Sequence, residues 1–429
     1  MVAVCFYFQV HQPYRLRKYP VFDIGANSDY FNHEKNREIM LKVADKCYLP
    51  ANRVILDLIN EMGEEFRVSY SITGVALEQF REYCPEVLES FQRLTDTGQV
   101  ELLDETYYHS LSFLYSEREF IEQVKMHRKA MKELFGYKPR VFRNTELIYN
   151  NRLASLAEEM GYKGVLAEGA DHILGWRSPN FLYKPVTAKR IRLLLKNYRL
   201  SDDIAFRFSE RSWEGWPLTA EKFANWISKI NGNGNCVNLF MDYETFGEHQ
   251  WESTGIFDFL RRLPAEILKH PDNEFMTPSE VVREFKPVAE LDVHNVVSWA
   301  DVERDLSAWL GNPMQMSAIE CLYRLEDSVK ESGDEKLLED WRRLQTADHF
   351  YYMCTKWFND GDVHKYFNVY ERPHDSFIAF MNVLNDMGIR LKIHKNWREK
   401  NGKEKNNEGK KECEEIFGGR YSRELLLGQ

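Results

Sequence analysis

The sequence predicts an α/β protein whose main domain is a closed β/α barrel, followed by a C-terminal α-helical domain. Short runs rich in β-branched and aromatic residues recur through the first 245 residues, and stretches with apolar residues at helical spacing lie between many of them. After Pro287 the helical spacing continues, but strand-like runs become few. Strands that alternate with helices form a parallel sheet with both faces buried.

Eight apolar runs are the expected strands. They are Val2–Val10, Phe66–Ile72, Gln99–Leu103, Arg140–Phe142, Gly164–Leu166, Arg190–Leu195, Ile204–Phe208 and Cys236–Met241. We expect helices at Glu117–Glu133 and Asn151–Met160, because apolar residues there recur three and four positions apart. Seven or eight such units in about 250 residues match the size of a closed barrel, and a doubly wound open sheet is the alternative.

The C-terminal part of the chain has three stretches with helical spacing. They are Asp301–Lys330, Lys336–Trp357 and Ser376–Met387. We therefore expect a barrel domain over residues 1–287 and a helical domain over residues 288–394. Residues 395–429 are rich in Lys, Glu, Asn and Gly and have too little apolar surface to offset the entropy of ordering, so a mobile polar tail is expected.

The overall composition excludes several classes of partner. A net charge of −10 argues against nucleic acid or an anionic membrane as the main partner. We expect no membrane span, because no run of about 18 apolar residues exists. We expect no signal peptide, because the N-terminus lacks a basic segment and a small-residue cleavage site. The seven cysteines are scattered and include no C-x-x-C pair, which favours reduced core cysteines in a cytoplasmic protein.

Polar residues lie near the end of one expected strand and directly after three others. In a parallel barrel the C-terminal strand ends meet at one opening, so we expect these side chains to gather there. Two of the segments carry acids immediately after a strand, in FRNTEL and in LFMDYETFGEH. The candidate residues of the four segments are His11, Gln12, Glu101, Glu146, Asp242 and Glu244.

A fifth candidate segment, SWADVERDLSAWLGN at residues 298–312, lies beyond the barrel. Asp301 and Asp305 are one helical turn apart, and so are Asp305 and Trp309. An acid and an indole on one helix face could stack on and hydrogen-bond a sugar ring. A capping acid and a packed tryptophan would give the same pattern.

Two carboxyl groups from different strands suit the hydrolysis of a glycosidic bond. One carboxylate attacks the anomeric carbon, and the other carboxyl group, held protonated, gives its proton to the leaving oxygen. Glu146 and Asp242 are the best candidates for this pair. The proton donor needs a raised pKa, and the apolar neighbours Phe240, Met241 and Tyr243 beside Asp242 favour that.

Taken together, the five segments resemble glycoside hydrolase family 57, over residues 1 to about 390. The resemblance implies a (β/α)7 barrel with a helical C-terminal region that completes the cleft, and retaining cleavage of α-glucans. It implies that Glu146 is the nucleophile and Asp242 the acid/base, while His11, Glu101 and Glu244 bind the sugar. The chain departs from the family pattern at Gln9, where many members have His, and at Arg143, where many have Trp.

The archaeal-type α-amylase subgroup has the most similar motifs, which include FRNTELIYN, LSDDIAFRF, MDYETFGEH and QTADHFYYM. This resemblance implies starch, glycogen or maltooligosaccharides as substrates. We expect no cofactor, because the chain has no nucleotide-binding glycine loop and no G-x-S-x-G nucleophile elbow, and we expect no metal. The further substrate-binding residues expected from these motifs and from the tryptophan-rich loop RSWEGW are Gln12, His249, Trp213, Trp216, Trp299, Asp301, Asp305, Trp309, Asp348 and His349.

Other functions remain open at this level. A 4-α-glucanotransferase or a branching enzyme would use the same covalent intermediate and pass the sugar to another glucan. A metal-dependent polysaccharide deacetylase can also use a seven-stranded barrel, but no histidine here has another histidine four positions away. A glucan-binding protein without catalysis is a third class, which the intact Glu146 and Asp242 argue against. The sequence does not indicate an oligomeric state.

Overall fold

The computed structural model describes residues 2–356 and 368–392, which form two compact units. The first unit contains residues 1–13 and 33–306, and the second contains residues 14–32 and everything from Ser307 onward. The first unit therefore extends beyond the boundary expected at residue 287, because residues 288–306 pair with barrel segments. The expected tail, residues 395–429, lies outside the described residues.

The first unit is a barrel of seven parallel strands in the order β3-β2-β1-β8-β7-β5-β4. This confirms the predicted α/β barrel. Its strands are β1 (Val2–Val10), β2 (Val68–Ile72), β3 (Val100–Leu102), β4 (Val141–Arg143), β5 (Gly164–Glu168), β7 (Arg192–Lys196) and β8 (Cys236–Asp242). A short strand, β9 (Asn273–Phe275), pairs with the start of β1, and β6 (Lys184–Pro185) pairs with β10 (Glu290–Leu291).

The barrel closes where the chain leaving β3 meets β4. Asp104 forms a parallel bridge with Phe142, with backbone hydrogen bonds of 3.1 and 2.9 Å on either side. The buried Asp104 carboxylate accepts hydrogen bonds from His127 (2.5 Å), Arg128 (3.1 Å) and Tyr162 (2.5 Å). One buried side chain thus ties two outer elements to the closing seam.

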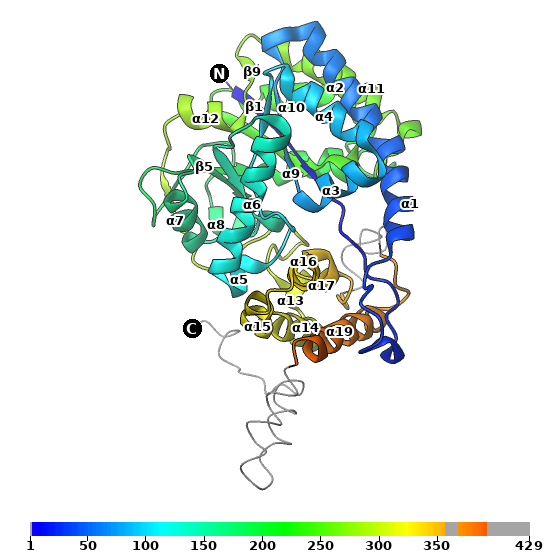
Figure 1. Cartoon of the computed structure of the whole chain (residues 1–429). Helices are drawn as coiled ribbons and strands as arrows, with labels where there is room; N and C mark the ends of the chain where they lie inside the picture. Colours follow the sequence, from blue (N-terminus) through cyan, green and yellow to red (C-terminus); the bar gives the residue numbers. More distant parts are fainter. Residues whose placement is uncertain (1, 357–367, 393–429) are drawn as a thin grey trace, which may run out of the picture. The chain divides into compact units, whose positions relative to one another are not determined.

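Helices cover the outside of the barrel. In Figure 1 the helices α2, α4 and α11 lie side by side over one part of it. The helices of this unit are α1 (His33–Val43), α2 (Leu49–Met62), α3 (Gly74–Tyr83), α4 (Pro85–Asp96), α5 (Ser112–Tyr115), α6 (Glu117–Phe135), α7 (Asn151–Glu159), α8 (Asp171–Leu174), α9 (Tyr198–Ala205), α10 (Ala220–Ser228), α11 (Ile256–Leu268) and α12 (Pro278–Glu284).

Seven of the eight predicted strands are present, and the eighth is wrong. Ile204–Phe208 was expected as a strand, but Ile204 and Ala205 end helix α9. The Asn197 side chain caps this helix by accepting a hydrogen bond from the Leu200 N–H (3.1 Å). The local signal was therefore an N-cap followed by an amphipathic turn, which outweighs a short apolar run.

The core explains why the strands are continuous apolar runs. All nine residues of β1 are buried, because both faces of a barrel strand are covered. A cluster of small and aliphatic side chains fills the interior, with Tyr7 and Phe240 packed edge to face at 5.4 Å. The six described cysteines are all buried, as core cysteines would be.

The second unit is helical. Its helices are α13 (Ser307–Leu310), α14 (Pro313–Arg324), α15 (Glu326–Glu331), α16 (Glu335–Arg343), α17 (Ala347–Tyr351) and α19 (Pro373–Arg390). The N-terminal segment 14–32 joins it through hydrogen bonds of Tyr30 and the Gly25 N–H to Asp386 (2.5 Å each). The predicted helix Asp301–Lys330 is wrong at its start, since helix begins only at Ser307.

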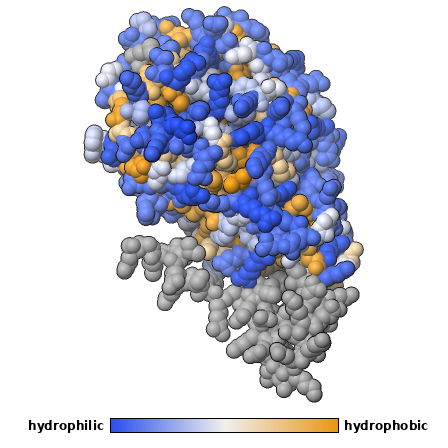
Figure 2. All heavy atoms as spheres, turned by 60° about the vertical axis from the view of Figure 1, so that its left-hand side comes forward, coloured by the Kyte–Doolittle hydropathy of each residue, from blue (hydrophilic) through white to orange (hydrophobic). Residues whose placement is uncertain are grey.

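Figure 2 shows a largely hydrophilic face with scattered hydrophobic residues. Within residues 2–356 and 368–392, no helix is long and apolar enough to cross a bilayer.

Candidate active site

The two proposed catalytic carboxylates follow parallel barrel strands at the same end. Glu146 lies in a 3-10 turn (Thr145–Leu147) after β4, and Asp242 is the last residue of β8. Glu146 has a left-handed backbone (φ 56°, ψ 26°), and His109 also has a positive φ of 51°. Non-glycine residues adopt this conformation at a cost, so the surrounding contacts must hold these two residues in place.

Glu146 is held by a donor on each carboxylate oxygen. His109 Nε2 lies 2.8 Å from Oε1, and the indole N–H of Trp299 donates to Oε2 at 2.7 Å. Burial favours the neutral acid. The hydrogen bond and charge of His109, the charge of Arg143 and the Trp299 bond outweigh burial and hold the pKa of Glu146 below 4.5. Glu146 is therefore a carboxylate at neutral pH.

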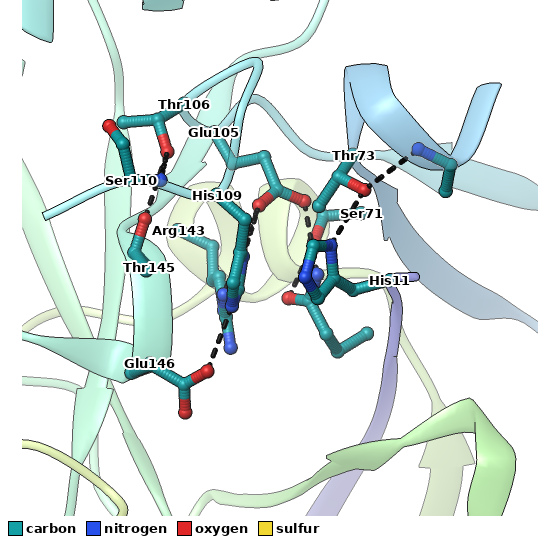
Figure 3. Close-up of polar contacts among 12 residues, drawn as sticks. His11, Ser71, Thr73, Glu105, Thr106, His109, Ser110, Arg143, Thr145 and Glu146 are labelled. Atoms are coloured by element: carbon teal, nitrogen blue, oxygen red, sulfur yellow. Dashed lines mark hydrogen bonds and ion pairs between the residues drawn. The ribbon is translucent and has the colours of Figure 1, made fainter. Parts of the chain in front are cut away.

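His109 bridges Glu146 and a second buried acid, Glu105 (Figure 3). Its Nδ1 lies 3.2 Å from Glu105 Oε2. Burial opposes the charged imidazole, but the two carboxylates raise the pKa of His109 to about 9. The pKa of Glu105 falls to about 2 against the effect of burial, through His109 and then Arg143. The result is an ionised Glu105–His109–Glu146 relay, with His11 stacked on His109 at 4.0 Å.

Both positions at which the sequence departs from the family pattern face Glu105. Gln9 Nε2 donates to Glu105 Oε1 at 3.2 Å, and Arg143 Nη1 lies 3.9 Å from Oε2. The Arg143 guanidinium is fully buried with its face 4.9 Å from the Trp299 ring, and its nitrogens have no hydrogen-bond partner among the described residues. Arg143 therefore acts on this site mainly through its charge.

Asp242 has the opposite electrostatic environment to Glu146. Burial and then the charge of Glu146 raise the pKa of Asp242 from 3.8 to about 6, against Arg143 and Lys196. Its neighbour Glu244 is buried, and burial together with the Asp242 charge raises the pKa of Glu244 to about 8. The Tyr48 hydroxyl donates to Glu244. Each of these acids can therefore hold a proton near neutral pH.

Three other predicted residues also lie near the strand ends: His11, Gln12 and His249. His11 and Gln12 lie directly after β1. His11 Nδ1 is 3.0 Å from Thr73, and a hydrogen bond from Gln12 acts on Glu244. His249 is partly buried after the Gly247 turn, and burial lowers its pKa to about 4.

Glu101 has no hydrogen bond to this group among the described residues, and its role in binding sugar stays a prediction. The Ser279 N–H (2.8 Å) and hydroxyl donate to the two oxygens of its carboxylate, at the N-terminus of α12. Glu101 is the second residue of β3 (Val100–Leu102), whereas Glu105 lies beyond the C-terminal end of that strand. Glu105, four residues later, reaches the nucleophile's histidine instead.

The tryptophan-rich loop lies between α9 and α10. Trp213 packs edge to face on Trp226 with ring centroids 6.1 Å apart, whereas Trp216 is 42% exposed. Stacking on sugar by these two residues stays a prediction.

The fifth segment differs from its expected form. Asp301 lies in a turn with a φ of 57°, and Asp305 is exposed, so the two acids do not share a helix face. Trp309 and His349 are buried at 2% and 1% in the second unit, which contradicts the sugar-stacking surface expected of Trp309. Asp348 lies in the first turn of α17, partly buried. Trp299 is placed in the site, but as a donor to Glu146.

Sequence reasoning missed Glu105 and His109 as site residues. A signal was present, because GQVELLDETYYHS puts a second acid and a histidine four residues apart just after β3. It also missed Lys196, the last residue of β7, which lies 3.1 Å from Asp202 and 3.8 Å from Glu168. These residues lie at or near the C-terminal ends of β3 and β7, which is where the active site of a parallel barrel lies.

The described parts of the chain contain no cluster of metal-ligating side chains. No group of three or more His, Cys, Asp or Glu side chains there is arranged to hold a metal ion. The histidine next to the nucleophile is instead engaged by carboxylates on both ring nitrogens.

The chain matches a protein family and curated proteins. The family described as glycosyl hydrolase family 57 matches residues 5–294. A protein of Methanocaldococcus jannaschii named "Putative alpha-amylase" is 46% identical over 96% of this chain and 91% of its own length. The α-amylase of Pyrococcus horikoshii is 26% identical over 36% of this chain and 24% of its own length.

Solved structures share the fold at low identity. The 4-α-glucanotransferase of Thermococcus litoralis gives a TM-score of 0.67 at 15% identity, and the match covers 90% of this chain and 60% of that one. A branching enzyme of Pyrococcus horikoshii gives 0.64 at 17% identity, over 97% and 94%. The α-amylase AmyC of Thermotoga maritima gives 0.60 at 14% identity, over 98% of both chains.

Proposed function

This chain belongs to glycosyl hydrolase family 57, and on that premise we propose that it cleaves α-1,4-glucosidic bonds of starch, glycogen or maltooligosaccharides with retention of configuration. The relative at 46% identity, with its α-amylase name, supports hydrolysis of this substrate class. The observation that carries the mechanism is the opposite pKa shift of two acids at one barrel opening, with Glu146 lowered and Asp242 raised.

In the first step Glu146 is the nucleophile. One of its oxygens attacks the anomeric carbon while Asp242 gives its proton to the glycosidic oxygen. The bond between that carbon and that oxygen breaks, and the shortened glucan leaves with a new hydroxyl group. The remaining sugar stays bound to Glu146 as an ester, and Asp242 is now a carboxylate.

In the second step Asp242 acts as a base. It takes a proton from a water molecule, whose oxygen attacks the anomeric carbon and releases Glu146. The loss of the Glu146 negative charge in the ester lowers the pKa of Asp242, since that charge raises it in the free enzyme. Asp242 is then better suited to ionise and accept the water proton.

The donors around Glu146 prepare it for attack. His109 and Trp299 occupy one lone pair on each oxygen, and each carboxylate oxygen retains a second lone pair. A charged His109 keeps the nucleophile ionised, and it also stabilises Glu146 when the carboxylate leaves in the second step. Orientation of this kind brings the reacting atoms into line and lowers the barrier.

The test is a time course of products from maltoheptaose and amylose, separated by chain length, with and without a chelator. We expect shorter maltooligosaccharides with rising reducing ends in both conditions. Glu146→Gln should abolish turnover, whereas Glu133→Gln, an exposed glutamate on α6, should leave it unchanged.

Three results would contradict parts of the proposal. Products both longer and shorter than the donor, at constant reducing ends, would make the protein a 4-α-glucanotransferase or branching enzyme. Full hydrolysis by Glu146→Gln would remove Glu146 from the nucleophile role. No change on either glucan, together with chelator-sensitive release of acetate from an acetylated glycan, would make it a deacetylase.

A further inference from the structure

Trp299 contacts the nucleophile through both its side chain and its backbone. The indole N–H donates to Glu146 Oε2 at 2.7 Å, and the backbone N–H donates to Glu146 O at 3.1 Å. Just before Trp299, Val297 pairs antiparallel with Tyr149, three residues after the nucleophile. The position of Trp299 therefore fixes both the carboxylate and the strained backbone of Glu146.

The loop that carries Trp299, residues 298–305, is held by Arg304. Its Nη1 donates to the Trp299 carbonyl at 2.5 Å. The carbonyl of Arg304 accepts from the Ser298 N–H at 3.1 Å, which closes the loop at its base. Asp301 and Arg304 both have a positive φ, 57° and 54°, so the loop needs such contacts to keep its shape.

The same guanidinium is anchored to the barrel. Arg304 Nη2 donates to Asp202 Oδ2 at 3.2 Å, and Nη1 lies 3.3 Å from Glu168 Oε2. Glu168 is the last residue of β5 and has no solvent exposure, and Asp202 lies on α9. Lys196 contacts both acids and lies 5.2 Å from the centre of the Trp299 ring. Two acidic and two basic side chains thus form one cluster.

The chemistry of arginine suits this place. A planar guanidinium presents several N–H donors in a fixed fork, so it can bind a carbonyl and two carboxylates at once. A lysine would keep the charge but lose this geometry. Direct contacts thus lead from β5 and α9 to Arg304, from Arg304 to Trp299, and from Trp299 to Glu146.

We propose that Arg304 is a positioning residue for the nucleophile, which acts by holding Trp299 against Glu146. This inference rests on the proposed function, in which Glu146 attacks the sugar. The alternative is that Arg304 only stabilises the fold, so that its loss lowers the melting temperature and the amount of folded enzyme without changing the chemistry.

A double-mutant cycle separates these cases. We expect Arg304→Ala and Arg304→Lys to lower kcat about tenfold to a hundredfold, with KM changed less than about threefold, because misplacement of a reacting group costs rate more than binding. Trp299→Phe removes the donor and should cost at least as much. The variant with both Arg304→Ala and Trp299→Phe should be no slower than Trp299→Phe alone. Losses that multiply would overturn the proposal.

The matched control is Arg199→Ala. Arg199 is 72% exposed on the same helix as Asp202 and pairs with Asp171, so it tests the loss of an arginine ion pair outside the Trp299 loop. Its kcat should stay within about twofold of the wild type. If Arg304→Ala does not fold, Arg304→Lys and Asp202→Asn provide milder losses of the same contacts.

A second readout does not depend on glucan cleavage. Proteins labelled with 13C at the glutamate carboxyl groups can be titrated by NMR, and the Glu146 signal is the one missing from Glu146→Gln. Since the Trp299 bond lowers the pKa of Glu146, we expect Arg304→Ala to raise it and Arg199→Ala to leave it unchanged. An unchanged Glu146 titration in Arg304→Ala would overturn the inference. Inactivity of the wild type on glucans, with that shift present, would overturn only the proposed function.

Discussion

Asp242→Asn should make the protein more stable at alkaline pH while it removes the acid/base. In the folded state burial and the charge of Glu146 raise the pKa of Asp242 from 3.8 to about 6. At pH 8 the group is ionised in both the folded and the unfolded states, but the folded state ionises it at a cost. Asn carries no charge and avoids that cost.

The size of the effect follows from linkage. A rise of two pKa units or slightly more corresponds to about 3 kcal/mol at about 1.4 kcal/mol per unit. Asp242 is partly exposed, and solvent screening reduces the figure, so we expect a gain of about 2 kcal/mol at pH 8. An acid with a raised folded pKa destabilises the fold as pH rises from its unfolded to its folded value. The gain should therefore fall below about 1 kcal/mol at pH 4.

Urea unfolding of the wild type and Asp242→Asn at pH 4 and pH 8 measures this difference. Asp57→Asn, at an exposed position on α2, is the control and should change stability equally little at both pH values. Comparison between pH values removes any loss of packing or hydrogen bonding common to both. An Asp242→Asn variant that is no more stable relative to the wild type at pH 8 than at pH 4 would refute the raised pKa.

Three further predictions concern the same framework. The pH profile of kcat/KM should fall on its alkaline side with an apparent pKa near 6, because Asp242 must be protonated, and a fall that begins only above pH 8 would contradict this. Glu105→Gln should lower the pKa of His109 and so raise the pKa of Glu146, which moves the acidic side of the kcat/KM profile to higher pH. A profile that does not move would contradict the coupling of Glu105 to Glu146 through His109. Asp104→Asn should cost about 3 kcal/mol in urea unfolding, since the barrel seam loses a buried carboxyl group that accepts three hydrogen bonds, and a cost under about 1 kcal/mol would show that the seam does not depend on it.

Most strands, and the acids near their ends, could be predicted because a barrel strand is buried on both faces and must be apolar along its length. A run such as Val2–Val10 must be apolar on both faces, so its strand ends are visible in the sequence. The same logic predicted Glu146, which lies just after β4, and Asp242, which is the last residue of β8. The strands and the acids at their ends can both be recognised from neighbouring residues alone, without knowledge of distant contacts.

Long-range contacts could not be predicted from the sequence. Glu101 and Glu105 are an even number of residues apart, so an extended strand would place both side chains on the same face. The sequence does not show that Ser279 on α12 donates hydrogen bonds to Glu101. Asp301 and Asp305 have helical spacing, but a left-handed turn at Asp301 separates them. The turn is held by Arg304, whose partners come from elements about one hundred residues away or more.

The two departures from the family pattern also depend on distant contacts. Gln9 and Arg143 are on different strands and appear unrelated in the sequence. In the structure both face Glu105, so they belong to one electrostatic arrangement.

The most direct test of the account is to trap the covalent intermediate. The enzyme is incubated with a 5-fluoro-α-glycosyl fluoride, digested and examined by mass spectrometry. We predict that the peptide containing Glu146 gains one fluoroglycosyl group, and that Glu146→Gln shows no such gain. Label on another residue, or an unlabelled enzyme that releases β-configured product from an α-glucan, would contradict the assignment of Glu146 as the nucleophile of a retaining enzyme.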